Sequence, residues 1–245
     1  MVMKMIEMRN ITKIFGKEFK AVDSLNLNIE KGIIYGFLGP NGAGKTTTLK
    51  MITGILSPDS GEVIINGIDI NKEPTLAKKQ FGFVSDNPDL FLKLRGIEYL
   101  KFIGSVYDIN NIKLRENIIK YSKMFEMNEV LNNKIESYSH GMRQKISLIG
   151  ALIHEPKVWI LDEPLTGLDP KSSFTLKEMM REHADKGNIV LFSTHVLEVA
   201  EKVCDKVAII SKGKLIFDGT IKDMKEKVGE DESLEKMFLE LVDDE

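Results

Sequence analysis

Eight consecutive residues, Gly39 to Thr46, have the spacing of a phosphate-binding loop: Gly-Pro-Asn-Gly-Ala-Gly-Lys-Thr. Glycines let backbone N–H groups converge on phosphate oxygens at a helix start, Lys45 adds a positive charge, and the Thr46 hydroxyl can bind Mg²⁺. A chance match to this pattern in a chain of this length is on the order of one per cent. The pattern predicts an ATP or GTP site formed by Gly39, Pro40, Asn41, Gly42, Ala43, Gly44, Lys45, Thr46 and Thr47.

Two carboxylates, Asp162 and Glu163, follow the apolar run Val158 to Leu161. Ligands of open α/β sheets bind beyond the carboxyl ends of the strands, so both acids are expected to face the phosphate loop. The alternative is an ordinary solvated strand end. Beside the loop, we expect Asp162 to serve Mg²⁺ and Glu163 to act as the base that activates the attacking water.

Ser139 stands at the start of a helical pattern that continues through Ile146 and Ile149. The first N–H groups of a helix have no partner within the helix, and such a site can bind an anion. Serine is also a common helix cap, and without other motifs the cap is the preferred explanation of this residue. Both interpretations stay open at this point.

The elements that must position these residues follow from hydrophobic periodicity. Alternation predicts a first strand within Met1 to Asn10 and another over Leu25 to Glu30, and an apolar run predicts a strand at Ile33 to Leu38 before the loop. Asn66-Gly67 predicts a hairpin turn between short apolar segments. The early part of the chain is therefore expected to be rich in antiparallel strands.

The later part alternates between strands and helices. A strand at Phe81 to Val84 precedes a mostly helical stretch from Pro88 to Ala151, and buried strands are expected at Val158 to Leu161 and Ile189 to Phe192, separated by a helix. Strands that alternate with helices imply a parallel sheet. A hairpin follows over 207–217, and the chain is expected to end in a helix with Leu234, Met237, Phe238 and Leu241 on one face. That helix would dock on its own domain or on a partner.

Bulk properties limit the class of protein. Lys and Arg total 34 against 37 Asp and Glu, a formal charge of -3, so we expect no nucleic-acid partner. The single cysteine, Cys204, cannot form an intrachain disulfide, which favours a reducing compartment. The N-terminus lacks a signal-peptide core, and no apolar run approaches the roughly 18 residues of a membrane span. Any membrane-embedded part is expected to be another chain.

Taken together, these motifs resemble the nucleotide-binding subunit of ATP-binding cassette (ABC) transporters. Besides the phosphate loop and the run Val158 to Glu163, the signature sequence of that family corresponds to residues 138–142, Tyr-Ser-His-Gly-Met, and its aspartate loop to residues 166–169. His195 occupies the place of the switch histidine, and Phe15 that of the aromatic on which adenine stacks. The motifs are in family order and cover nearly the whole chain.

The resemblance implies a fold and a mechanism. The fold is α/β: a P-loop NTPase core with a mixed, largely parallel sheet and an N-terminal antiparallel β-subdomain (1–86 and 156–245), and an inserted helical signature subdomain (87–155). Two copies would close head to tail over two ATP molecules, so that Ser139, His140, Gly141 and Met142 contact the ATP of the opposite subunit. Glu163 and His195 would hydrolyse ATP, and the movement would drive a membrane partner.

Each of three residues that the resemblance assigns to the site also has a purely structural explanation. Phe15 could belong to the core, His195 could cap the following helix, and Asp169 could be the cap ahead of Pro170, alone or in addition to its family role.

The chain departs from the family pattern in two places. Asp86 stands where the family usually has glutamine; a carboxylate is a good Mg²⁺ ligand, but Asp-Asn-Pro is also ordinary turn chemistry. In the signature, His140 replaces a glycine and Met142 a glutamine. This form of the signature resembles exporter-type subunits that work with separate membrane proteins.

We therefore expect an ATP-hydrolysing subunit, with ATP and Mg²⁺, that energises a separate integral membrane permease, in the export direction. It would lie in the cytoplasm, at the inner face of the membrane, through that permease. The alternative is a soluble cassette ATPase acting on ribosomes or DNA, whose relatives usually carry two cassettes or a long coiled coil. A small-molecule kinase would explain neither the signature nor His195.

Overall fold

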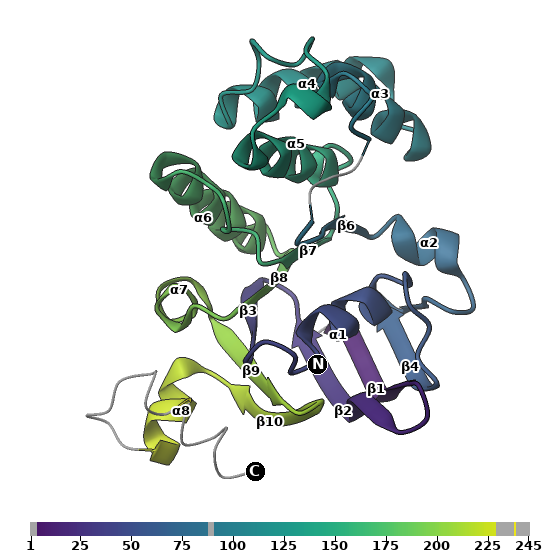
Figure 1. Ribbon diagram of the computed structural model, residues 1–245, viewed down its shortest axis with the longest axis vertical. Coiled ribbons are helices and arrows are strands. Elements are labelled where there is room, and N and C mark those ends of the chain that lie inside the picture. The colour runs from purple at the N-terminus through teal and green to yellow at the C-terminus, as the bar shows by residue number, and fades with distance from the viewer. Residues whose placement is uncertain (1–3, 88–90, 229–237, 239–245) are drawn as a thin grey trace.

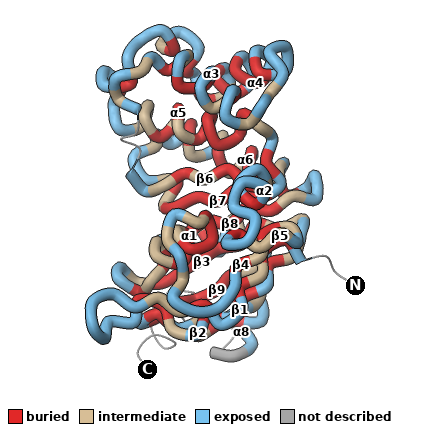
Figure 2. Tube along the Cα trace, turned by 90° about the vertical axis from the view of Figure 1, so that its right-hand side faces the viewer, coloured by how far each residue is buried: buried red, intermediate tan, exposed pale blue. Residues whose placement is uncertain are grey.

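The computed structural model describes residues 4–87, 91–228 and 238 (Figure 1). A helical region lies at one end of the molecule and two sheets lie at the other. The central strands are buried, whereas most exposed residues lie in the outer helices and the connecting loops (Figure 2).

The N-terminal sheet has the strand order β2-β1-β4-β5 and is antiparallel throughout. Its strands are β1 (Lys4–Phe15), β2 (Phe19–Glu30), β4 (Ser60–Ile65) and β5 (Ile68–Asp69). The alternation predicted for β2 is confirmed, because Leu25, Leu27 and Ile29 are buried while Asn26 and Asn28 are exposed. The predicted turn is confirmed as well: Asn66 and Gly67 both have positive φ and join β4 to β5.

The second sheet has the order β10-β9-β3-β8-β7-β6 and is the mixed, largely parallel sheet that the sequence predicts. Four strand pairs are parallel and the edge pair β9–β10 is antiparallel. The strands are β3 (Ile33–Leu38), β6 (Phe81–Val84), β7 (Val158–Asp162), β8 (Ile189–Thr194), β9 (Lys206–Ser211) and β10 (Lys214–Gly219). Because β3, β8 and β7 are neighbours and parallel, their carboxyl ends meet at one edge of the sheet.

In the described part of the chain, the helices that accompany the two sheets are α1 (Lys45–Ile52), α2 (Pro74–Lys78), α6 (Pro170–Asp185), α7 (Leu197–Val203) and α8 (Ile221–Val228). The sequence patterns do not predict α2, which has five residues and is too short to show a helical period. The long helix α6 begins at Pro170, as the sequence suggests, and its core-facing side includes Leu176 and Met180.

The helical region contains α3 (Gly96–Val106), α4 (Asn111–Met124), the 3₁₀ turn η1 (Ile135–Ser137) and α5 (His140–Leu152). Its apolar core is continuous with one face of the large sheet, so that Leu100 and Leu148 share a cluster with Trp159. The helix α5 lies close to β6, since a Cβ atom added at Gly82 would meet the carbonyl oxygen of Ala151 at 2.0 Å. The helices are therefore attached to the sheet by close backbone packing.

Two of the sequence predictions fall partly outside the described residues. The first is the helical stretch, which is expected to begin at Pro88. The second is the C-terminal helix, of which Leu234, Met237 and Leu241 are not described. Phe238 is described, and it packs against the small cluster that contains Met224. Within the described part of the chain, no helix is long and apolar enough to cross a lipid bilayer.

Candidate active site

The phosphate loop connects β3 to α1 at the edge where the parallel strands end. The helix starts at Lys45, and Gly44 caps it with φ of +107°. A Cβ atom at Gly44 would lie 2.4 Å from the carbonyl oxygen of Ala21, so both the backbone conformation and the space require glycine there. The loop therefore presents its N–H groups close to a helix N-terminus, as the sequence predicts.

Lys45 is held inside this loop. Only 7 % of this residue is exposed to solvent. Its Nζ donates hydrogen bonds to the carbonyl oxygens of Gly39 (2.6 Å) and Pro40 (3.1 Å). Burial lowers the pKa of Lys45, and the nearby carboxylates of Glu163 and Asp162 oppose that effect. The ammonium group is thus a desolvated cation beside two acids, poised to interact strongly with an anion.

Asp162 ends β7 and is 1 % exposed, so the alternative of a solvated strand end is wrong. The Ser193 hydroxyl of the neighbouring strand β8 donates to Oδ1 of Asp162. Oδ2 is buried and has no hydrogen-bond partner among the described residues. Burial raises the pKa of Asp162, and the negative charges of Asp86 and Glu163 raise it further, while Ser193 and the nearby Thr46 hydroxyl lower it.

Glu163 and His195 meet at the same edge although 32 positions separate them in the chain. Nδ1 of His195 lies 2.9 Å from Oε1 of Glu163, a hydrogen-bond distance in which the imidazole N–H donates to the carboxylate. Glu163 has φ of +47°, an uncommon backbone conformation for a residue other than glycine, and such conformations cluster at functional sites.

The helix after His195 has its own cap. Val196 is the cap residue of α7, and the hydroxyl of Thr194 accepts a hydrogen bond from the Val196 N–H. The alternative that His195 caps α7 is therefore wrong, and its ring is directed to Glu163 instead.

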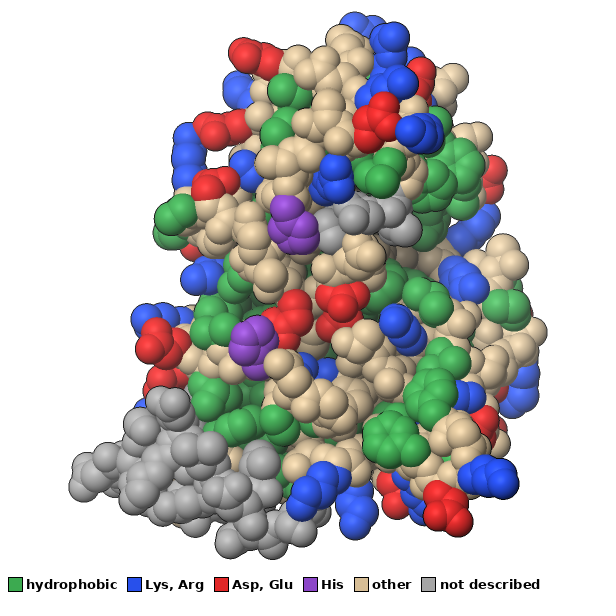
Figure 3. Space-filling model, in the orientation of Figure 1, with side chains coloured by type: hydrophobic (Ala, Val, Ile, Leu, Met, Phe, Trp, Pro, Cys, Tyr) green, Lys and Arg blue, Asp and Glu red, His purple; other side chains and the backbone are tan. Residues whose placement is uncertain are grey.

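A cavity of about 340 Å³ extends from Lys45 and Glu163 to the β1–β2 hairpin, whereas Asp162 and His195 are not among the residues that line it. Figure 3 shows acidic and histidine side chains gathered at the middle of this face, between the helical region and the sheets. Of the predicted residues, ten line the cavity: Phe15, Pro40, Asn41, Gly42, Gly44, Lys45, Thr46, Thr47, Asp86 and Glu163. Gly39 and Ala43 do not line the cavity. Ala43 is buried, and Gly39 packs against the backbone of Ile210.

Sequence reasoning missed Phe19, which also lines the cavity. Phe19 pairs directly with Phe15 across the β1–β2 hairpin, and both residues line the cavity. Phe19 is 64 % exposed and Phe15 is 43 % exposed. Phe15 is therefore not part of the core. The signal for Phe19 was present as a second aromatic residue across a short turn that contains Gly16, but only strand pairing brings the two rings to one cavity. On the other side, the Lys13 ammonium lies 5.9 Å from the centroid of the Phe15 ring.

The signature residues lie elsewhere on the same chain. Ser139 caps α5, its hydroxyl accepting a hydrogen bond from the Met142 N–H at 3.3 Å, so its cap function is confirmed. Ser139 and His140 are exposed, Gly141 and Met142 are half-buried, and none of the four lines the cavity. A single copy of the chain therefore does not bring the signature residues to its own phosphate loop.

Asp169 connects the signature helix to the loop that follows β7. It caps α6, accepting hydrogen bonds from the Ser172 N–H and hydroxyl, and these bonds together with Lys145 hold the pKa of Asp169 well below its usual value. Lys145 of α5 lies 2.9 Å from Oδ2 of Asp169, and Gln144 donates to the carbonyl of Pro164 at 3.3 Å. The cap function proposed for Asp169 is confirmed.

A glycine loop between β3 and α1, beside a buried carboxylate at the end of β7, defines a P-loop nucleotide-binding α/β protein. The family model described as "ABC transporter" matches residues 22–166, which is more than half of the chain. The chain belongs to the ABC transporter family, as one of its ATP-binding cassettes.

Curated relatives and solved structures agree with this assignment. The chain is 36 % identical to the ABC transporter ATP-binding protein NatA of Bacillus subtilis (strain 168), covering 86 % of each chain. It is 34 % identical to the linearmycin resistance ATP-binding protein LnrL of the same organism, over 93 % of this chain and 73 % of LnrL.

Two solved structures are similar over most of the chain. The ATP-binding subunit of an ABC transporter superposes with a TM-score of 0.92 at 29 % identity, over 97 % of this chain and 99 % of that one. The ATP-binding cassette MJ0796, solved as a dimer in a post-hydrolysis state with ADP and Pi, gives a TM-score of 0.80 at 26 % identity, over 89 % and 99 %.

Proposed function

We propose that this chain hydrolyses ATP to energise a separate integral membrane permease, in the direction of export. The single observation that carries the hydrolytic part is the Glu163–His195 pair, 2.9 Å apart, in which Glu163 lines the phosphate-loop cavity. The transport part is supported by membership of the ABC transporter family, and the direction by a relative that is named for linearmycin resistance.

The cavity has separate places for the parts of ATP. Phe15 and Phe19 offer apolar ring surface to adenine, and the loop N–H groups with Lys45 bind the phosphates. Lys45 would exchange its two carbonyl partners for phosphate oxygens, which are stronger acceptors for an ammonium group.

The residues present also fit Mg²⁺, which the family implies. Oδ2 of Asp162 is a buried oxygen without a hydrogen-bond partner among the described residues, and the Thr46 hydroxyl and Asp86 lie near it. Mg²⁺ usually takes one or two protein carboxylates together with phosphate oxygens and water. Thr46, Asp162 and Asp86 would hold the ion, which neutralises phosphate charge when bound.

Glu163 is placed to remove a proton from the attacking water. Its Oε1 is oriented by His195, whose Nδ1–H donates to it, and Glu163 lines the cavity. His195 would sense the terminal phosphate from the same position, because its ring is exposed at this edge.

A second copy of the chain would complete the site. Ser139, His140, Gly141 and Met142 do not line the cavity of their own chain. They begin helix α5, where Ser139 and His140 are exposed, and a helix start of this kind can bind an anion. The cassette MJ0796, which is similar over 89 % of this chain, is a dimer, and this supports the association of two copies. In the proposed head-to-tail dimer, the four signature residues would contact ATP of the opposite subunit. Asp169, tied to the signature helix through Lys145, would transmit this contact to the loop of Glu163.

The remaining assignments follow from this role. As the ATP-binding subunit of a transporter, the chain would lie at the inner face of the membrane, bound to its permease. The division into a core of 1–86 and 156–245 and a signature subdomain of 87–155 then separates the part that binds ATP from the part that contacts the second copy.

The test is Glu163→Gln in the full chain. Loss of the base is expected to lower ATP hydrolysis by roughly two to four orders of magnitude, while ATP binding remains and an ATP-bound dimer accumulates. The measurements are phosphate release, ATP affinity and sedimentation with Mg²⁺-ATP. Glu178→Gln, an exposed glutamate on α6, is the matched control and should hydrolyse ATP normally. Full hydrolysis in Glu163→Gln would remove Glu163 from the mechanism.

A further inference from the structure

The turn between β9 and β10 is packed inside the molecule at one residue. The hairpin of β9 and β10 lies beside β2 (Figure 1), and its turn consists of Lys212 and Gly213, both with positive φ, +45° and +82°. Two successive residues with positive φ are typical of the tight turn that joins antiparallel strands. Lys212 and Lys214 are exposed, as expected at the tip of a hairpin, but Gly213 between them is buried. Another part of the chain therefore covers the tip.

The backbone of Gly213 is bonded to two distant segments. Its N–H donates a hydrogen bond to the carbonyl oxygen of Ala43 in the phosphate loop at 3.0 Å. Its own carbonyl accepts a hydrogen bond from the Asp23 N–H of β2 at 2.9 Å. The turn thus connects the phosphate loop to β2, and only the fold brings these three segments together.

The space around Gly213 admits no side chain. A Cβ atom there would lie 2.9 Å from the carbonyl oxygen of Ala21 and 3.1 Å from that of Lys20. The Ala21 carbonyl is also the atom that a Cβ at Gly44 of the phosphate loop would meet at 2.4 Å. The loop and the turn therefore pack on the same carbonyl group of β2, and neither can shift far without disturbing the other.

The hydrogen bond from the turn sets the orientation of one peptide unit of the loop. In a trans peptide the carbonyl and the following N–H point in opposite directions, and no cis peptide bond is found among the described residues. Because the Ala43 carbonyl points to the turn, the Gly44 N–H points away from it, and Gly44 lines the ATP cavity. Phosphate oxygens accept from N–H groups and are repelled by carbonyl oxygens, so this orientation is the one that binds an anion.

Within the loop itself, glycine gives this peptide unit freedom to rotate. Gly44 has φ of +107°, and a glycine backbone adopts either sign of φ at little cost. The Ala43 N–H is bonded inside the loop, to the Pro40 carbonyl at 3.2 Å, whereas the Ala43 carbonyl is bonded outside it, to the turn. If the unit between Ala43 and Gly44 rotated by half a turn, a carbonyl oxygen would face the phosphates.

We propose that Gly213 is a positioning residue for phosphate binding: by holding the Ala43 carbonyl, its N–H keeps the Gly44 N–H directed at a phosphate oxygen of the nucleotide. The proposal rests on the function proposed above only in that the phosphate loop binds ATP. It gives a function at this site to a hairpin whose own described residues do not line the cavity.

The direct test removes the N–H without adding an atom. In the full chain, an ester bond replaces the amide between Lys212 and Gly213, by incorporation of the hydroxy acid that corresponds to glycine. Loss of this hydrogen bond is expected to weaken ATP and ADP binding about threefold to tenfold. The control is the same replacement between Lys186 and Gly187, because Gly187 also has positive φ (+80°) and its N–H donates to the Ala184 carbonyl at 2.8 Å. The control protein should bind both nucleotides as wild type does.

Gly213→Ala tests the same contact through its geometry. The added methyl group meets two carbonyl oxygens of β2 and pushes the turn away from the loop. The KM for ATP is expected to rise at least about tenfold, while kcat at saturating ATP stays within about threefold of wild type, because Glu163 and His195 are unchanged. Gly187→Ala introduces the same strain of positive φ with nothing within 4 Å of the new Cβ, so it should alter neither constant.

These measurements distinguish positioning from a merely structural role. A partly unfolded variant loses active protein, which lowers kcat and leaves KM unchanged. The ester protein decides the question if Gly213→Ala does not fold.

Three outcomes would overturn the proposal: ATP and ADP affinities of the Gly213 ester equal to those of wild type, equal loss of affinity in the two ester proteins, or a fall in kcat alone in Gly213→Ala. Absence of ATP binding by wild type would overturn the proposed function and the positioning role together, and it is a different result from wild-type affinity in both ester proteins.

Discussion

The α/β core and the helical region bury polar side chains in different ways. At its active site the core buries charged groups, Lys45 and Asp162, and leaves one oxygen of Asp162 without a hydrogen-bond partner in the described structure. The helical region buries Asn117, Ser122 and Gln144, all neutral, and each donates to a backbone carbonyl.

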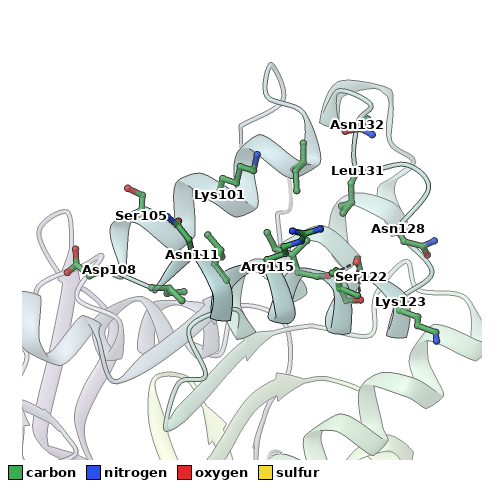
Figure 4. A pocket seen from close by; sticks show the side chains of 15 residues that line it. Lys101, Ser105, Asp108, Asn111, Arg115, Ser122, Lys123, Asn128, Leu131 and Asn132 are labelled. Atoms are coloured by element: carbon green, nitrogen blue, oxygen red, sulfur yellow. Dashed lines mark hydrogen bonds between the residues drawn. The ribbon is translucent and has the colours of Figure 1, made fainter.

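This difference distinguishes buried groups that serve the active site from buried groups that stabilise the fold. Burying a charge is costly unless a partner or ligand compensates it, so the charges of the core indicate a site that is completed on binding. Buried amides that satisfy backbone carbonyls stabilise the fold without implying a ligand. Among the described residues of the helical region, the cations Lys101, Arg115 and Lys123, which line a cavity between α3 and α4 (Figure 4), form no ion pair, and all three are exposed to solvent.

The largest expected effect concerns Asp162, where a substitution should lower activity and raise stability. Asp162→Asn should lower ATP hydrolysis by at least about a hundredfold, because the carboxylate that faces the phosphates is lost. The same change should raise the free energy of unfolding by about 1 kcal/mol, because it removes a buried charge whose pKa is raised by burial and by Asp86 and Glu163. Urea unfolding and phosphate release measure the two effects. A variant that is both inactive and less stable would contradict the view that this charge is kept for chemistry.

In the helical region the opposite result is expected. Asn117→Ala removes the Nδ2 donor, 2.9 Å from the carbonyl of Ile153, and leaves a buried acceptor unpaired. The free energy of unfolding should fall by about 1 to 3 kcal/mol, with ATP affinity unchanged in the folded protein. Asn132→Ala, at an exposed position, is the control for urea unfolding. If Asn117→Ala altered ATP affinity without loss of stability, the two regions would not differ as described.

A smaller effect is expected at the aromatic end of the cavity. Phe19→Ala should weaken ATP binding about threefold to tenfold and leave stability unchanged, because Phe19 is exposed and contributes ring surface only to the bound base. Phe15→Ala should cost roughly 1 to 3 kcal/mol of binding free energy. Phe174→Ala, on α6 and 66 % exposed, is the matched control. Calorimetric titration that found Phe19→Ala equal to Phe174→Ala would exclude Phe19 from the base site.

The smallest effect concerns the junction between the two regions. His154 stacks on Tyr107 of the helical side, with ring centroids 3.7 Å apart, and its Nε2 lies 3.1 Å from the Phe81 carbonyl of β6. Burial lowers the pKa of His154 to about 4, although the hydrogen bond to Phe81 opposes this. The unfolded imidazole binds a proton near its ordinary pKa of about 6.5, so the stabilisation present above that pH is lost as the pH falls toward 4.

His154→Gln should therefore reduce the loss of stability between pH 6.5 and pH 4 by about 1 to 2 kcal/mol. The measurement is the free energy of urea unfolding of both proteins across that range. If the free energy of unfolding changed with pH equally in wild type and variant, burial at this junction would not oppose protonation of His154.

Local patterns predicted the parts of the fold that local physics determines. The strands Ile33 to Leu38 and Phe81 to Val84 have the predicted bounds, and the turn at Asn66-Gly67 lies where its residues require positive φ. The glycine loop was predictable for the same reason, since its glycines and Lys45 act through consecutive backbone. Phe19 was not, because its contribution depends on its partner across a hairpin and not on its own neighbours in the chain.

The sequence by itself determined that this chain is an α/β protein with a phosphate loop, an acidic strand end and a signature helix. Periodicity and residue chemistry act over a few positions and therefore survive in the linear chain. Only the tertiary structure decided that Glu163 meets His195, that Lys145 meets Asp169, and that Phe15 and Phe19 line one cavity. Those relations depend on strand order and helix packing, which bring together residues that no local pattern connects.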